Sequence, residues 1–399
     1  MQKSGYEQRE VIKFNFDNLD LNKNEFFGNS PPSVFVGRFG YPDVNVGVLS
    51  PVQTMKDAHL LDSPKDWIKL KLKDEEILKL RSKLVNARFK TRIKSFDHKF
   101  TDLSQEIGMA HKPVEIEVEL KNKPLNKLKL DKIGSPLSNN ANAKNIRLTE
   151  NPKIKTIVDK TVSDIDLKST LGLKKLYDKG VNENFLSKIL SIGLLGLKKN
   201  RKLVPTRWSI TATDDTLGKE MLKDVKFNDI IDHTRVYFGG NLGNYYLVLF
   251  FPGVWSYELF EMGVPFRENP WSKSGKYYAT DCESFDSRKK YASETAGGYY
   301  ACRIGIIEKL NELKKQGSVL VLRFITSEDK YPLGVWVCRE ATRTSMKSGF
   351  IEFEDKELAI NYTKSLVKKK FGQDISEIIN ISKVLNVVNT QKRISEFFQ

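Results

Sequence analysis

Seven consecutive apolar or aromatic residues, YYLVLFF from Tyr245 to Phe251, constrain the fold of this chain most strongly. A run of this kind with no polar residue is typical of a strand that is buried on both faces of a sheet. The run is followed by Pro252 and Gly253, and it is too short to span a bilayer. It therefore predicts an interior strand.

Other segments predict both strands and helices. Residues 114–120, VEIEVEL, alternate apolar and acidic positions, which is the period of a half-buried strand. The apolar runs in 318–325 and in GVWVCREAT, 334–342, predict two further strands, and the Gly- and Pro-rich residues 30–51 predict a turn-rich segment. Helices are expected at residues 66–88, 182–199, 295–315 and 355–372.

These elements lack the regular βαβ spacing of a doubly wound fold, so we expect an α+β fold of mixed sheets with packed helices. A chain of 399 residues is long for one core and predicts two globular parts followed by a short flexible C-terminal tail. We place the first part at residues 1–270, including a basic excursion near 121–145, the second at 271–385, and the tail at 386–399.

The chain carries 66 Lys and Arg against 50 Asp and Glu, a net charge of +16, which favours polyanionic partners such as DNA. A solvated, lysine-rich surface would give the same balance. The three cysteines, Cys282, Cys302 and Cys338, form no CxxC pair, so no zinc site is expected. The N-terminus has no apolar segment for secretion or anchoring, so we expect a cytoplasmic, nucleoid-associated protein with no membrane partner.

The last nine residues, QKRISEFFQ, place Gln391, Ile394, Phe397 and Phe398 at positions i, i+3, i+6 and i+7. This pattern resembles the PIP box, the peptide that binds the sliding clamp PCNA. The resemblance implies a turn that brings Ile394 and both Phe rings into one apolar pocket while the glutamine amide fixes the register. Lys392 and Arg393 would add attraction at an acidic rim, and Ser395 and Glu396 complete the motif. The alternative is a terminal helix that packs on the protein's own core.

Five segments of the body resemble the Nre family of archaeal DNA-repair proteins. They are residues 30–47, 202–215, 245–262, 293–310 and 332–343. Members of this family commonly end in a clamp-binding peptide, so the body and the tail agree. Many members begin with a four-cysteine zinc finger, whereas this chain has no cysteine before Cys282. The resemblance implies participation in DNA repair together with PCNA, and it implies no particular reaction.

Arginines in the family-like segments are candidates for phosphate or nucleic-acid contact. Arg38 lies between glycines in a turn, Arg207 precedes Trp208, and Arg339 and Arg343 lie at the end of the strand expected at 334–342. Each has a structural alternative, either a plain turn or an ion pair with a nearby glutamate. The aromatic residues of these segments, Trp208 included, suit base stacking or core packing, and their apolar neighbours favour the core.

The adjacent carboxylates Asp214 and Asp215 are a candidate Mg²⁺ site, and the hydroxyl residues before them, which would alternate along a strand, are candidates for contact with phosphate or ribose. Their alternative role is to cap a helix that begins near Leu217. Together with Glu258 and Glu261 they would form a two-metal nuclease centre, although no spacing demands it.

The leading hypothesis is a DNA-repair factor that binds PCNA through its tail and DNA through its basic body. Two alternatives remain open: a metal-dependent enzyme that acts on DNA ends or nucleotides, and an adaptor without DNA contact. The chain contains no Walker loop, GxGxxG or GxSxG motif, and its four histidines are scattered singly. No catalytic residue is therefore assigned.

Overall fold

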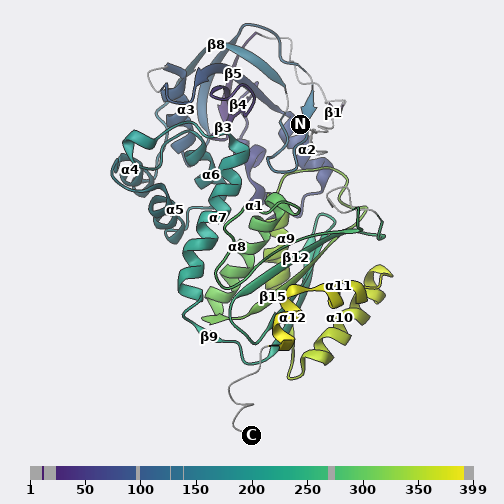
Figure 1. Cartoon of the computed structure of the whole chain (residues 1–399). Coiled ribbons are helices and arrows are strands. Elements are labelled where there is room, and N and C mark those ends of the chain that lie inside the picture. Colours follow the sequence, from purple (N-terminus) through teal and green to yellow (C-terminus); the bar gives the residue numbers. More distant parts are fainter. Residues whose placement is uncertain are drawn as a thin grey trace. The chain divides into compact units, whose positions relative to one another are not determined.

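The computed structural model describes residues 11–12, 24–95, 99–125, 127–137, 139–267 and 275–390. The chain forms two compact units (Figure 1), of which the first comprises residues 1–217 and 331–336 and the second 218–330 and 337–399. Both units combine helices with a mixed sheet, which confirms the predicted α+β class and its two parts. The boundary that we placed at residue 270 falls inside the second unit.

The first unit is built on a six-stranded sheet. Its strands, in spatial order, are β2 (Glu25–Ser30), β6 (Val114–Leu120), β8 (Asn140–Leu148), β5 (Leu84–Arg92), β4 (Asp43–Pro51) and β3 (Ser33–Val36). Strands β5 and β8 pair in parallel, and the other neighbours pair antiparallel. Strand β6 has the predicted bounds, and its apolar residues are buried while its acidic residues are not. A short strand β1 (Val11–Ile12) pairs with β7 (Leu128–Lys129).

This sheet is strongly curved (Figure 1), because two residues connect its opposite edges. Strands β2 and β3 are at the two ends of the strand order, yet only Pro31 and Pro32 separate them. Three peptide units span at most about 11 Å, so the edges must come together. The Ser30 hydroxyl donates a 2.7 Å hydrogen bond to the Leu49 carbonyl of β4, on the far side of the sheet order.

The apolar face of the sheet packs on α3 (Lys99–Met109). Val44, Val46 and Val48 of β4 are fully or almost fully buried on this face. The helix approaches closely at Gly108, where an added Cβ would meet the side chains of Ile192 and Val34. The other helices of the unit are η1 (Ala58–Asp62), α1 (Pro64–Lys69), α2 (Asp74–Ser82), α4 (Thr156–Ser163), α5 (Ser169–Asp178), α6 (Glu183–Ser191) and η2 (Lys198–Asn200).

The single helix predicted at residues 66–88 is wrong. Helix α1 ends at Lys69, Lys71 adopts a left-handed φ of 54°, and α2 follows only after this break. From Leu84 the chain pairs with β4 as strand β5, so tertiary pairing overrides the local helical spacing. The helix predicted at 182–199 is confirmed in its first half, and it ends because Gly193 takes a positive φ of 75°.

The second unit has a six-stranded sheet of its own. The order is β13 (Tyr278–Glu283), β12 (Ser256–Gly263), β15 (Ser318–Ile325), β11 (Asn244–Phe251), β10 (Thr234–Asn241) and β16 (Phe350–Phe353). Strand β11 lies between β15 and β10, which confirms the interior strand predicted from YYLVLFF. Only β12 and β15 pair in parallel. A two-stranded sheet joins β9 (Asp229–Ile230) to β14 (Lys315–Gln316).

Helices cover both faces of this second sheet. On one face lie α8 (Ala296–Leu313) and α9 (Trp336–Lys347). The Tyr257 hydroxyl of β12 donates a hydrogen bond to the Tyr299 carbonyl of α8. The Ser345 hydroxyl of α9 donates one to the Tyr246 carbonyl of β11. On the other face, Phe260 and Met262 share a core with helices α10 (Lys356–Phe371), α11 (Ser376–Ile381) and α12 (Lys383–Thr390). Helix α7 (Thr206–Val225) begins in the first unit and ends in the second.

The strand predicted at residues 334–342 is also wrong, because Trp336 to Lys347 form helix α9. The helix presents the small residues Ala341, Thr342 and Ser345 to the core, and all three are fully buried. A Cβ on Gly305 of α8 would lie 3.1 Å from the Thr342 side chain, so the two helices approach closely there. The Val and Trp residues that suggested a strand pack equally well on a buried helix.

Breaking the buried ion pair of the second unit should cost stability. Arg303 Nη1 lies 3.3 Å from Glu283 Oε2, both side chains are at most 1% exposed, and Glu283 also accepts from Trp255 Nε1. We expect Arg303→Met to lower the free energy of unfolding by about 3 kcal/mol, because the carboxylate stays buried without its cation. Urea titration measures this loss. Lys223→Met, which removes an exposed i,i+3 pair with Glu220, should cost at most about 0.5 kcal/mol, and equal losses would contradict the prediction.

Candidate functional site

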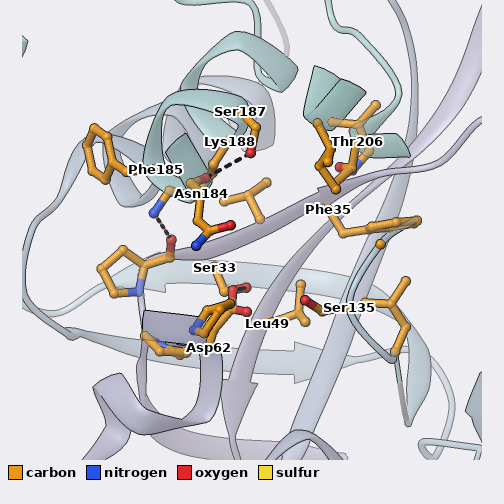
Figure 2. Close-up of a pocket in the computed structure, with 18 of the residues that line it drawn as sticks. Ser33, Phe35, Leu49, Asp62, Ser135, Asn184, Phe185, Ser187, Lys188 and Thr206 are labelled. Atoms are coloured by element: carbon orange, nitrogen blue, oxygen red, sulfur yellow. Dashed lines mark hydrogen bonds between the residues drawn. The ribbon is translucent and has the colours of Figure 1, made fainter. Parts of the chain in front are cut away.

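A pocket of about 610 Å³ lies within the first unit, and all of its lining residues fall between Pro31 and Ile210. The volume is in the range of small-molecule and cofactor sites. Strands β3, β4 and β5 contribute to its lining, as do η1, the loop around Asp131, α6 and the first turn of α7. Figure 2 shows Asn184 and Lys188 of α6 across the pocket from Ser33, Leu49 and Asp62.

Strand register places the pocket residues of the sheet on one face. Phe35 of β3 pairs with Gly47 of β4, and Gly47 pairs with Arg88 of β5, so the three form a row across the sheet. Gly47 is required there, because an added Cβ would lie 1.7 Å from Asn86 Oδ1 and 3.3 Å from Arg88 Cγ. The glycine therefore leaves room for the Arg88 side chain beside Phe35.

The turn that joins β3 to β4 carries Arg38 and Phe39, both of which line the pocket. The Gly37 and Asp43 amides close the hairpin by donating to the Asn45 and Gly40 carbonyls at 2.7 and 2.8 Å, and Gly40 takes a positive φ of 81°. The Arg38 guanidinium lies 5.0 Å from the centroid of the Phe39 ring. The turn expected around Arg38 is therefore the β3–β4 hairpin, which presents these two side chains.

Helix α6 forms a second wall. Its first turn is capped by Asn182, whose Oδ1 accepts from the Phe185 amide at 2.9 Å. Lys188 Nζ donates to the Pro32 carbonyl and lies 4.7 Å from the Phe185 ring centroid. Burial lowers the pKa of Lys188 to about 8, although the charge of Asp62 opposes this shift. Lys188 is thus a cation that loses its charge as the pH rises through about 8.

The two acidic residues that line the pocket are already engaged by cations. Asp62 accepts from Ser33 Oγ and from Arg81 Nη1, the latter at 2.6 Å. Asp131 Oδ2 lies 3.1 Å from Arg207 Nη1, and its other oxygen accepts from the Ile133 amide at 2.7 Å. Both carboxylates are therefore held mainly by an arginine of the pocket itself.

The pocket has an excess of positive charge. Its basic residues are Arg38, Lys65, Arg81, Arg88, Lys129, Lys155, Lys188 and Arg207, against Asp62 and Asp131. Arg88 forms no ion pair within the described part of the chain, its Nε is buried without a hydrogen-bond partner, and burial lowers its pKa. A buried donor without a partner is costly, so this wall suits an anionic ligand.

The structure brings two of the four predicted arginines together, since Arg38 and Arg207 both line this pocket. The strand and the helix cap expected for Asp214 and Asp215 are wrong, because both residues lie in the middle of α7, and neither lines the pocket. Within the described residues, no group of three or more His, Cys, Asp or Glu side chains is placed to hold a metal ion.

Arg339 and Arg343 lie on helix α9 in the second unit, not at a strand end. Arg339 is buried, and Arg343 is paired with Glu308 at 2.6 Å and with Glu340 at 2.7 Å, which is the ion-pair alternative. The predicted clustering of Glu258 with Glu261 is also wrong. Glu258 accepts from Ser382 Oγ and the Val384 amide, whereas Glu261 binds Arg323 on the opposite face of β12.

Sequence reasoning missed Arg88 and Lys188. Arg88 is the last residue of the helix that we expected at 66–88, so it was not considered as a site residue. The alternation of polar and apolar residues in NARFKTR, 86–92, is the signal that predicts a strand there. Lys188 resembles any surface lysine of an amphipathic helix, and its hydrogen bond to the Pro32 carbonyl depends on a contact distant in sequence. The eight residues of the tail motif, Gln391 to Phe398, lie outside the described residues.

Comparison with known proteins now identifies the family. The model described as "Archaeal Nre, N-terminal" matches residues 8–272, and the model described as "Archaeal Nre, C-terminal" matches residues 283–397. The chain belongs to the archaeal Nre family. This confirms the resemblance seen in the five sequence segments, and places the pocket in the part that the N-terminal Nre model covers.

Three relatives extend the match over most of the chain. The chain is 35% identical to the DNA repair protein NreA of Haloferax volcanii, covering 83% of this chain and 80% of the relative. It is 36% identical to the NreA protein of Archaeoglobus fulgidus (86% and 85%) and 33% identical to the NreB protein of that organism (85% of each), both named DNA repair proteins. No solved structure matches the chain. None of the described helices has the length and apolar character needed to cross a membrane.

The lowered pKa of Lys188 should make stability depend on pH. Because its folded pKa is below the unfolded value of about 10.4, the unfolded chain binds this proton more tightly, and stability rises as pH increases through 8. Lys188→Met removes this gain. Between pH 7 and pH 9 the wild type should gain about 1.4 kcal/mol of unfolding free energy from this group, and the variant should not. The variant should therefore become about 1.4 kcal/mol less stable relative to the wild type over this range.

Urea titrations at the two pH values measure this difference. Lys175→Met, which changes an exposed lysine on α5, is the matched control and should show a difference that does not change with pH. A pH-independent difference for Lys188→Met as well would show that Lys188 keeps an ordinary pKa in the folded protein.

Proposed function

We propose that this chain is a DNA-repair factor that binds DNA through its first unit and is recruited to DNA by PCNA through its C-terminal motif. Support for a repair role comes from relatives that are named DNA repair proteins and match more than four fifths of the chain. The cationic pocket carries the DNA-binding part of the proposal. DNA is a polyanion, and the pocket has eight basic side chains against two acidic ones, with Arg88 in no ion pair among the described residues.

The tail supports recruitment by the clamp. The motif from Gln391 to Phe398 begins directly after α12, which ends at Thr390. Val384 and Leu385 of this helix are buried in the core of the second unit, so the motif is tethered at a fixed point of the fold. A peptide at the end of a chain can bind a partner without disturbing the packed core. Two adjacent Phe anchors supply the buried area that small interfaces depend on.

Replacing both anchors should abolish clamp binding. We expect Phe397→Ala/Phe398→Ala to weaken binding to the cognate PCNA by at least about 100-fold, because truncating one anchor residue typically costs 2 kcal/mol or more. Isothermal titration calorimetry measures the affinity. Phe227→Ala, which removes a Phe that is 91% exposed on the second unit, should bind PCNA like the wild type. Equal binding by all three proteins would show that the tail is not the clamp ligand.

DNA affinity should depend steeply on salt. If about three phosphates are neutralised, raising the salt fourfold from about 50 mM should weaken binding roughly 40-fold, since each neutralised phosphate releases condensed counterions. Fluorescence anisotropy with a labelled duplex that carries a single-stranded extension measures this slope. An absence of binding at low salt would indicate an adaptor without DNA contact, and binding independent of salt would contradict phosphate neutralisation.

A further inference from the structure

Three exposed aromatic side chains lie beside the pocket in the first unit. Phe39, Tyr41 and Trp208 are 55%, 41% and 47% exposed. Our sequence-based preference for core packing is therefore wrong for Trp208, although Trp255 and Trp336 are buried as expected. The rings of Tyr41 and Trp208 have centroids 5.4 Å apart, so the β3–β4 hairpin and the first turn of α7 meet at this point.

Each of these two elements presents an arginine next to an aromatic residue. Arg38 precedes Phe39 on the hairpin, and Arg207 precedes Trp208 on α7. Arg38, Phe39 and Arg207 line the pocket, whereas Tyr41 and Trp208 are not part of its lining and follow these residues closely in the same two elements. Arg207 is held toward the Asp131 loop by its ion pair, and Arg38 lies against the Phe39 ring. We call Phe39, Tyr41 and Trp208 the aromatic rim.

The combination of the rim with the pocket restricts the chemistry of the ligand. Arg88, deep in the sheet face, lacks an anionic partner, which favours a ligand with a phosphate. Exposed aromatic rings favour a ligand with flat, apolar faces. A nucleotide has both parts. In a duplex the base faces are covered by their neighbours, so stacking on side chains requires unpaired nucleotides.

We propose that the pocket and its aromatic rim bind unpaired nucleotides of a nucleic-acid strand, with backbone phosphate at Arg88 and bases stacked on Trp208, Tyr41 and Phe39. This inference rests on the proposed function for the nature of the polyanion, which is DNA. The pocket volume of about 610 Å³ accommodates a sugar-phosphate unit together with a base. Lys188, on the opposite wall, adds positive charge below its pKa of about 8.

Variants of the full chain test the proposal by fluorescence anisotropy with a labelled thymidine dodecamer and with a duplex of the same length. We expect Trp208→Ala to weaken single-strand binding about 10-fold and Trp208→Phe to restore most of it, because one stacked base contributes about 1–3 kcal/mol. Arg88→Met should also weaken single-strand binding. Neither change should alter duplex affinity by more than about twofold, since a duplex reaches the protein only through general electrostatic attraction.

Phe227→Ala, an exposed aromatic of the second unit, is the matched control and should bind the strand like the wild type. Circular dichroism melts establish that each variant is folded. Wild-type strand affinity in both Trp208→Ala and Arg88→Met would overturn the proposal, and so would an equal loss of strand and duplex affinity. Thymidine monophosphate should bind far more weakly than the dodecamer. Equal affinities would assign the pocket to a free nucleotide and also overturn the strand proposal.

The assay separates this inference from the proposed function. No clamp is present, so Phe397→Ala/Phe398→Ala should bind the dodecamer like the wild type. If Phe397→Ala/Phe398→Ala no longer binds the clamp but still binds the dodecamer, both proposals are supported. If the rim variants bind the strand normally while the salt-dependent DNA binding persists, the pocket inference fails and the DNA-repair proposal stands.

Discussion

The connection of two sheet edges by Pro31 and Pro32 determines most of the first unit. Strands β2 and β3 are the two edge strands of the sheet, and this short link joins them directly. The six strands therefore have to curve until the two edges lie side by side. The curvature places Pro32 against α6, where its carbonyl accepts from Lys188. It also brings the β3–β4 hairpin beside the start of α7, since Thr206 Oγ1 accepts from the Val36 amide at 2.9 Å. The pocket forms where these elements converge.

Some cations of this pocket form ion pairs and others do not. The cations without ion pairs favour binding of an anionic ligand and lower the stability of the fold. Arg81 and Arg207 each have a carboxylate, and their ion pairs fix the loop around Asp131 and the end of η1. Arg88 and Lys188 are half-buried and form no such ion pair among the described residues, and burial lowers the pKa of both. Cations that are desolvated in this way destabilise a fold unless something else is gained. Binding an anion is the simplest gain.

The second unit differs from the first in how its arginines are paired. Three of its arginines form ion pairs within the fold: Arg303 with Glu283, Arg323 with Glu261, and Arg343 with Glu308. Arg323 also donates to Asn244 Oδ1, so its guanidinium is bonded on more than one side. Burial raises the pKa of Glu261, and Arg323 opposes this shift. The first pair joins α8 to β13, the second joins β15 to β12, and the third joins α9 to α8.

The sequence by itself determined the α+β class, the interior strand at Tyr245–Phe251, the strand at Val114–Leu120 and the helices at α8 and α10, because each of these segments is long or regularly patterned. It also identified the Nre family, two of the pocket arginines and the tail motif. Only the tertiary structure decided that residues 66–88 divide into two helices and a strand, and that residues 336–347 form a helix. It alone placed Phe35 and Arg88 on either side of Gly47 in one row of the sheet, and brought Lys188 to the Pro32 carbonyl. The physical reason is that strand pairing, chain closure and burial depend on partners far away in the sequence, and no local pattern records them.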